Sequence, residues 1–447
     1  MLRKEQKQQQ GTLFFTLKDM LNQKHSLFIL ANVINWKQFE DDFTPLYCEN
    51  NGRPAKPIRL MVGLLILKHL RNVSDESIVE QWSENAYYQY FCGENMFVPK
   101  VPCEASELVH FRNRIGEAGI ELILKESIRI NGKDSNDPNV SIDTTVQEKN
   151  ITFPTDAKLH RKIIEKCKKI TDKEELQIRQ TYTRTLKKLG VNQRFRNHPK
   201  NKLKARKADK KVKTIAGRLV RELERNLAPN SIYQNEITIY KQILNQKRSD
   251  KNKIYSIHEP DVQCISKGKE HKKYEFGNKV SIVYTQSTGV IVGALGFRNP
   301  YDGHTLQQVL DQSEKLLGQA SIKTATTDRG YRGVAKINDV IIQTPKKFNP
   351  KNQTKYQQCK LKKYFHRRAA IEPTIGHLKT DHRLNRNFYK GIVGDNINIM
   401  LAAAAFNIKR MMNKWKSSLL SIFYSIFIEP FLKFNFIFLL LRMKMSF

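Results

Sequence analysis

The chain is poor in acidic residues. Its 447 residues include 43 Asp and Glu against 78 Lys and Arg, which gives a formal net charge of +35 at pH 7. Such an excess of positive charge repels itself unless a polyanion is bound, so nucleic acid is the leading partner class. An anionic membrane surface is the weaker alternative. The length allows two or three domains.

CxxC pairs and nucleotide-binding loops are also missing, and we expect no leader segment. The six cysteines, at positions 48, 92, 103, 167, 264 and 359, form no CxxC pair. Their spacing argues against a zinc ribbon or a disulfide framework and favours a reducing compartment. No GxxxxGK[ST] or GxGxxG motif supports nucleotide-driven or dinucleotide chemistry. No apolar core with a small-residue cleavage site follows the N-terminus, so we expect no signal peptide and a cytoplasmic protein.

The C-terminal tail, residues 411–447, is rich in Phe, Leu and Ile. Glu429, Pro430 and Lys433 interrupt its apolar run. Neither half reaches the roughly 20 apolar residues that a membrane span needs. We therefore expect an appended packing tail and no membrane anchor.

Residues 37–131 have the pattern of short amphipathic helices joined by tight turns, after an N-terminal extension of residues 1–36. Pro57 is a favoured first-turn residue, and Ser74 can cap the next helix. The pattern fits a helical domain for DNA binding or dimerisation, and both a helix-turn-helix and a plain bundle remain open.

Residues 138–410 have a mixed α/β pattern. The alternation in NVSIDTTVQ predicts a half-buried strand with Asp143 on the face opposite Ile142. Two β-rich runs around QSTG predict a hairpin, and DGHTLQQVLDQSEKLLG predicts a helix. Asp302 and His304 could approach the site, but a cap of this helix is the favoured role for Asp302. SIKTATTDRG reads as a strand that ends at Asp328, and IEPTIGHLKTDHRL as a helix.

A basic helical insert, residues 157–253, interrupts this mixed region. It carries 29 Lys and Arg against 9 Asp and Glu, more than half of the excess charge of the whole chain. A charge run is usually a solvated face, but one this one-sided, in a chain this basic, favours a surface that lies along phosphates.

Three carboxylates from distant segments stand out: Asp143 in a strand, Asp328 at a strand end and Glu372 on a helix. If strand, strand and helix pack together, these acids converge, and converged carboxylates are stable chiefly around cations. Oxygen-only ligands favour Mg²⁺ or Mn²⁺ over zinc. Two such ions suit the in-line displacement of a phosphodiester, with Arg368 and Lys379 as phosphate contacts.

These motifs resemble those of insertion-sequence DDE transposases of the IS-five-like branch, whose catalytic domain is RNase H-like. The segments that carry the resemblance are PAKPIRLMVGLLILKHLRNVSDESIVEQW, IDTTVQEKNITFPTDAKL, HKKYEFGNKVSIV, TDRGYRG and RRAAIEPTIGHLKTDHRLNRN, in this order. The resemblance implies an α/β RNase H-like mixed sheet with flanking helices, preceded by an all-α N-terminal domain. It also implies that Asp143, Asp328 and Glu372 are the catalytic and metal-binding acids.

The last acid of that family lies in a Tyr-x2-Arg-x3-Glu-x6-Lys signature. Arg368, Glu372 and Lys379 match this spacing, but Phe365 stands where the family has tyrosine. Because Pro373 has no N–H, a helix must begin near Glu372 or kink there. Arg329 and Arg332, beside Asp328, are further candidates for contact with the DNA backbone.

The resemblance implies a prokaryotic, nucleoid-associated DNA transposase. With two Mg²⁺ or Mn²⁺ ions and no other cofactor, it would cleave the ends of its element and transfer the freed 3′-OH into target DNA. Its partner would be double-stranded DNA, bound by a homodimer. A catalytically silent or repurposed DNA-binding protein of the same fold is one alternative, and an endonuclease without strand transfer is another. A basic scaffold protein would leave the three acids unexplained.

Overall fold

A computed structural model describes residues 16–48, 52–247, 249–266, 272–298, 300–318, 321–345 and 354–423. The chain divides into two compact units. The first consists of Met1–Gln147, Lys279–Tyr389 and Val393–Phe447, and the second of Glu148–Asn278 with Lys390–Ile392. The expected N-terminal extension and C-terminal tail fall partly on residues 1–15 and 424–447, which lie outside the described residues.

The N-terminal part of the first unit is helical, as predicted. Ser74 caps α5 by accepting a hydrogen bond from the backbone N–H of Ser77, and α7 bends at Gly116, whose φ is 60°. The elements are α1 (Leu17–Met20), α2 (Ser26–Val33), α3 (Trp36–Phe43), η1 (Thr44–Leu46), α4 (Ile58–Arg71), α5 (Asp75–Glu84), α6 (Ala86–Phe91), α7 (Ala105–Ile130) and η2 (Gly132–Ser135).

A buried ion cluster joins these helices to the C-terminal part of the unit. Asp75, at the start of α5, accepts hydrogen bonds of 2.8 Å from Lys68 and from both terminal nitrogens of Arg112. Both cations lie over the ring of Tyr389, and Lys68 also donates to its hydroxyl. Helices α4, α5 and α7 are therefore fixed to each other by charge as well as by apolar packing.

The mixed sheet expected from the sequence is confirmed. Strand β1 lies between β3 and β5, followed by β7 and β6, while β4 pairs with β3. Strands β1, β5 and β7 are parallel, and β3 and β4 form the predicted antiparallel hairpin. The strands are β1 (Asn139–Lys149), β2 (Gln263–Ile265), β3 (Glu275–Thr285), β4 (Ile291–Phe297), β5 (Thr324–Thr326), β6 (Lys336–Ile337), β7 (Val340–Gln343) and β8 (Arg386–Asn387).

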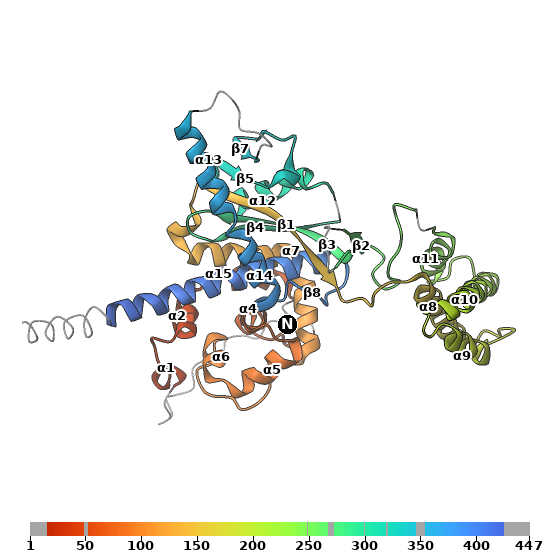
Figure 1. Ribbon diagram of the computed structural model, residues 1–447. Helices are drawn as coiled ribbons and strands as arrows, with labels where there is room; N and C mark the ends of the chain where they lie inside the picture. The colour runs from red at the N-terminus through yellow and green to blue at the C-terminus, as the bar shows by residue number, and fades with distance from the viewer. Residues whose placement is uncertain are drawn as a thin grey trace, which may run out of the picture. The chain divides into compact units, whose positions relative to one another are not determined.

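Apolar side chains cover both faces of this sheet. Val280 and Ile282 of β3 belong to one core with the N-terminal helices and α15, whereas Val283 belongs to a second core with α12. The period of two along a strand sends successive residues to opposite faces. Figure 1 shows the sheet and these helices together. The remaining helices of this part are η3 (Asp302–Thr305), α12 (Leu306–Leu317), η4 (Arg329–Tyr331), α13 (Lys355–Arg368), α14 (Ile371–Asp381) and α15 (Gly391–Phe423).

Helix α15 is long and apolar enough, by length and composition, to cross a membrane. However, 78% of its most apolar window is buried against the rest of the chain. Ala402, Ala403 and Ala404 let neighbouring elements approach closely. Its apolar character is thus explained by its place in the core.

The second unit contains the helical insert predicted from the sequence. Its core is formed by apolar residues spaced three and four apart, such as Val212, Ile215 and Leu219 on α10 and Ile237 and Tyr240 on α11. The helices are α8 (Asp156–Lys173), α9 (Thr183–Asn192), α10 (Pro199–Asn226) and α11 (Gln234–Asn245). Because their inner faces are apolar, the basic residues of the insert gather on the outer faces.

The Asp75 cluster leads to a prediction about stability. Burial alone would raise the pKa of Asp75, but the hydrogen bonds from Arg112 and the charge of Lys68 lower it below its ordinary value. Asp75→Asn should cost about 3–5 kcal/mol of unfolding free energy at pH 7, because two buried cations lose their counter-ion. Urea denaturation measures this loss.

The matched control is Asp42→Asn, an exposed residue on α3. A lowered folded-state pKa stabilises the protein above the unfolded value, near 4, and this contribution is lost as the pH falls through the folded value. The difference between wild type and Asp75→Asn should therefore shrink below about pH 4. Equal stability of the two variants at pH 7 would contradict this role of Asp75.

Candidate active site

The register of β1 and β5 brings the first two predicted acids together. These strands are parallel, and Ser141 is paired with Thr326. Asp143 and Asp328 each follow their paired residue by two positions, so they stand side by side on the same face, just past the last residue of β5 and near the middle of β1. The side chain of Asp143 is 17% exposed, so it is accessible from one side only.

Hydrogen bonds from the backbone hold both carboxylates in place. The N–H of Thr144 donates to Oδ1 of Asp143 over 2.7 Å. The N–H of Gly330 donates to Oδ1 of Asp328 over 2.8 Å, so that Asp328 caps the short helix η4. A strand end followed by a capped turn presents the carboxylate beyond the sheet edge, which is where a polar ligand can reach it.

Tyr331, also in η4, is buried among these acids. Its burial raises the pKa of its hydroxyl well above the ordinary value, and the negative charges of Asp143, Asp302 and Asp328 raise it further. Because all three carboxylates act on the same hydroxyl, Asp302 belongs to the same cluster as the two predicted acids.

The prediction that Asp302 caps the following helix is wrong. The residue before α12 is Thr305, and η3, which begins at Asp302, is preceded by Tyr301. Instead, Oδ1 of Asp302 forms an ion pair with Nζ of Lys279 at 2.9 Å and accepts a hydrogen bond of 3.0 Å from the hydroxyl of Thr144. These two partners draw the carboxylate toward the sheet and away from the helix start.

The third predicted acid, Glu372, reaches the cluster through an arginine. Helix α13 ends at Arg368 and α14 begins at Ile371, with Pro373 in its first turn, so the predicted helix start near Glu372 is confirmed. The guanidinium of Arg368 lies 3.6 Å from Oδ2 of Asp143 and 3.9 Å from Oε1 of Glu372. Arg368 therefore joins the first and third acids although it and Glu372 are on separate helices.

The other predicted contact residues lie around this cluster. Lys379 is half-buried on α14, seven residues after Glu372, and Arg329 and Arg332 are exposed beside Asp328. Phe365, at the tyrosine position of the family signature, is half-buried on α13.

The sequence reasoning missed Thr144 and Lys279 as site residues, and it weighed Asp302 as a residue near the site but preferred a capping role for it. A lysine inside the apolar run KVSIVY was the available signal, because a charge within a strand needs a partner. The local sequence pattern does not indicate that Asp302 is the partner of Lys279.

The donor chemistry of the cluster fits a hard divalent cation. Carboxylate oxygens are what Mg²⁺ and Mn²⁺ prefer, and no sulfur or imidazole ligand is involved. Within the described ranges, no three His, Cys, Asp or Glu side chains converge closely enough to form a ready-made metal site. Glu372, 69% exposed and facing Arg368, is the acid with the most freedom to move.

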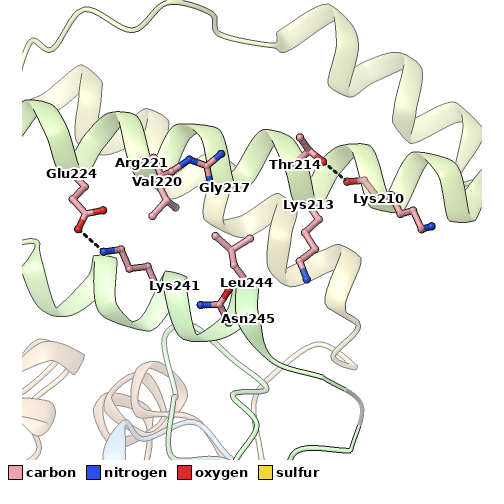
Figure 2. Close-up of a pocket in the computed structure, with 10 residues that line it drawn as sticks. All are labelled: Lys210, Lys213, Thr214, Gly217, Val220, Arg221, Glu224, Lys241, Leu244 and Asn245. Carbon is pink, nitrogen blue, oxygen red and sulfur yellow. Dashed lines mark hydrogen bonds and ion pairs between the residues drawn. The ribbon is translucent and has the colours of Figure 1, made fainter.

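A second polar feature lies on the insert. A hollow of about 770 Å³ between α10 and α11 is lined by Lys210, Lys213, Thr214, Gly217, Val220, Arg221, Glu224, Lys241, Leu244 and Asn245 (Figure 2). We call it the insert groove. The α10 residues recur at three- and four-residue intervals, so they share one helix face.

One acid lies in the insert groove among four cations. Glu224 forms an ion pair with Lys241 across the two helices. The guanidinium of Arg221 lies over Gly217, 3.4 Å from where a Cβ would be. Figure 2 draws no ion pair for the other three cations of the groove, Lys210, Lys213 and Arg221.

Taken together, an acid cluster at the edge of a mixed α/β sheet in a strongly basic chain is the arrangement of an enzyme that acts on phosphodiesters. Comparison with known proteins agrees. Residues 15–114 match the family described as "Transposase domain (DUF772)", and residues 255–408 match "Transposase DDE domain".

The chain is also 39% identical over 187 residues to "Uncharacterized protein ORF8 in nfe locus" of Rhizobium meliloti. The aligned part covers 41% of this chain and 90% of that protein. No solved structure shows a significant match. The chain belongs to the insertion-sequence DDE transposases, and its fold is RNase H-like, as the sequence motifs predicted.

Asp328 and Glu372 lie within the second matched range. Asp143 lies outside both, in the stretch between residues 114 and 255. The assignment of Asp143 therefore depends on its motif and on its register with β5.

The turn at Asp328 gives a structural prediction. Asp328→Asn keeps an oxygen that can accept the Gly330 N–H, so its melting temperature should match wild type. Asp328→Ala loses this cap and should be less stable by about 1 kcal/mol. Thermal unfolding without added metal measures both. Equal losses in the two variants would mean that the negative charge, and not the hydrogen bond, stabilises the turn.

Proposed function

We propose that this transposase cleaves the ends of its element by metal-dependent hydrolysis and then joins the freed 3′-OH to target DNA. The observation that carries the proposal is the parallel register of β1 and β5, which sets Asp143 beside Asp328. The contacts of Arg368 add Glu372 to the same group.

Asp143, Asp328 and Glu372 would hold two Mg²⁺ or Mn²⁺ ions, which supply charge neutralisation and activation of the attacking oxygen. The chain itself provides positioning. The backbone hydrogen bonds to Asp143 and Asp328 fix their carboxylates before any ligand arrives, so little reorganisation is needed when DNA binds.

Cations around the acids would bind the DNA backbone. Arg329 and Arg332 are exposed directly beside Asp328, and Lys379 lies on the helix of Glu372. Each can neutralise a phosphate and so align the scissile bond with the acids. Arg368 is different, because it is engaged by two carboxylates. It would keep Asp143 and Glu372 close together while no metal is bound.

The insert groove would hold a further stretch of DNA backbone. Lys210, Lys213 and Arg221 project from one face of α10, which suits the evenly spaced phosphates of a strand. No base-reading arrangement is needed for such a contact, because phosphates position a protein without specifying sequence.

Two outcomes compete with transposition. A chain that binds DNA without cutting would be a silent or repurposed copy of the same fold. A chain that cuts without joining would be an endonuclease. Because an element has two ends, we also propose that two copies of the chain act together on DNA.

Cleavage of labelled DNA carrying the element's ends tests the catalytic proposal. Wild type should release 3′-OH ends in Mg²⁺ or Mn²⁺ and lose this activity in EDTA. Asp143→Asn and Glu372→Gln should reduce the rate by about 10²-fold or more, because each removes a negative charge from the cation site. Asp339→Asn, at a fully exposed position on the same unit, should cleave like wild type.

Binding without cleavage by the wild type would refute the enzymatic proposal and leave the DNA-binding alternative. Cleavage without joined product, when a target plasmid is present, would favour the endonuclease.

The insert groove makes its own prediction. Lys210→Gln/Lys213→Gln should weaken binding of the full chain to duplex DNA and lower the slope of log K against log salt by about two units. Glu224→Gln should tighten binding about two- to fivefold, because Lys241 becomes available to a phosphate. Fluorescence anisotropy over a salt series measures both.

Glu165→Gln is the control for the second variant, since it removes one negative charge at an exposed position of α8, outside the groove. If Glu224→Gln and Glu165→Gln change the affinity equally, only overall charge matters and the groove is not a DNA site.

A further inference from the structure

Asp302 belongs to the acid cluster but to none of the motifs that define the three catalytic acids. Its Oδ1 accepts from Lys279 on β3 and from Thr144 on β1. Thr144 is the residue directly after Asp143, and its own N–H holds the Asp143 carboxylate. Asp302 is thus one hydrogen bond away from the residue that orients the first acid.

The other oxygen of Asp302 is turned toward the second acid. A Cβ on Gly330 would lie 3.1 Å from Oδ2 of Asp302 and 3.0 Å from Oδ1 of Asp328. Both carboxylates therefore lie close to Gly330, and a side chain there would force each of them to shift by a few tenths of an ångström. Asp302 is thus hydrogen-bonded to Thr144, which supports Asp143, and lies near Gly330, which supports Asp328.

Lys279 makes this arrangement rigid. It is 8% exposed, and it donates to the carbonyl of Pro300 over 2.7 Å as well as pairing with Asp302. A buried ion pair stabilises a fold no better than apolar side chains of similar volume. What the pair does provide is direction, because an ammonium that is also bound to the carbonyl of Pro300 limits how the Asp302 carboxylate can turn.

We propose that Asp302 is a positioning residue of the transposase site. Held by Lys279, it fixes the middle of β1 through Thr144 and lies near the Asp328 turn at Gly330, so that Asp143 and Asp328 stay beside each other and can share a divalent cation. This role rests on the proposed function for its catalytic consequence, but its effect on cation binding is independent of DNA.

The test removes the link between Asp302 and β1 without removing a charge. Thr144→Val has the shape of threonine but no hydroxyl, whereas Thr144→Ser keeps the hydroxyl. Asp302→Asn is the direct variant. For the full-length proteins, Mn²⁺ binding is measured without DNA by the EPR signal of free Mn²⁺, together with melting temperature and DNA cleavage over a Mn²⁺ series.

We expect Thr144→Val and Asp302→Asn to need roughly 10-fold more Mn²⁺ for half-saturation, and to cleave roughly 10- to 100-fold more slowly at limiting Mn²⁺. Thr144→Ser should bind Mn²⁺ and cleave like wild type, which a purely structural effect on packing would not produce. If Asp302→Asn fails to fold because Lys279 is left unpaired, the two Thr144 variants decide the question.

Mn²⁺ binding and cleavage by Thr144→Val that equal those of wild type would overturn the proposal. A wild-type chain that binds Mn²⁺ without cutting would refute the proposed function. The comparison of Mn²⁺ binding between wild type and the variants would still decide the role of Asp302. If wild type neither binds Mn²⁺ nor cuts, both proposals fall.

Discussion

The parallel pairing of β1 with β5 is the constraint on which the site depends. Side chains on a strand alternate between faces, so a shift of one residue in this pairing would send Asp328 to the face opposite Asp143. The register is held by Val140 and Ala325, which are paired and fully buried in the same apolar core. Burial of apolar residues thus determines where the carboxylates stand, although it makes no contact with them. The acids can repel each other without disturbing the sheet, because the free energy that holds the strands is supplied elsewhere.

The remaining parts of the site are held by charge. Lys279 draws Asp302 to the sheet, and Arg368 holds Asp143 near Glu372. The two cations differ in how closely they are held. The side chain of Lys279 is 10% exposed and has two acceptors, at 2.7 and 2.9 Å, whereas that of Arg368 is 19% exposed and lies 3.6 and 3.9 Å from its two partners. Asp143, Asp302 and Asp328 therefore form a rigid half of the site. Glu372, placed after a helix break and largely exposed, forms the half that can adjust when a cation and DNA arrive.

Much of this could be predicted from the sequence, since local patterns carry it. The alternation around Asp143 predicts a strand, the residues QSTG predict a hairpin, and Pro373 predicts a helix start near Glu372. The motif spacing then named the three acids. Asp302 was misjudged because an aspartate before a helical pattern is usually its cap, and the competing partner, Lys279, is distant in the chain. The shared core of the N-terminal helices with α15 was equally hidden, because an apolar face does not say which other face covers it.

The distribution of charge links the two kinds of surface. The chain has a net charge of +35, yet three of its aspartates, Asp143, Asp302 and Asp328, lie together where β5 ends, and the insert carries 29 Lys and Arg against 9 Asp and Glu. A polyanion is attracted to the basic surfaces and repelled by a carboxylate cluster. Under the proposed function, divalent cations would remove that repulsion at the site, so DNA would reach the acids only when these are neutralised. In the insert groove Glu224 pairs with Lys241, and a DNA phosphate would compete with Glu224 for that cation under the proposed function. Both proposed contacts would thus depend on a counter-charge, which is a divalent cation at the acid cluster and a phosphate at the Glu224–Lys241 pair.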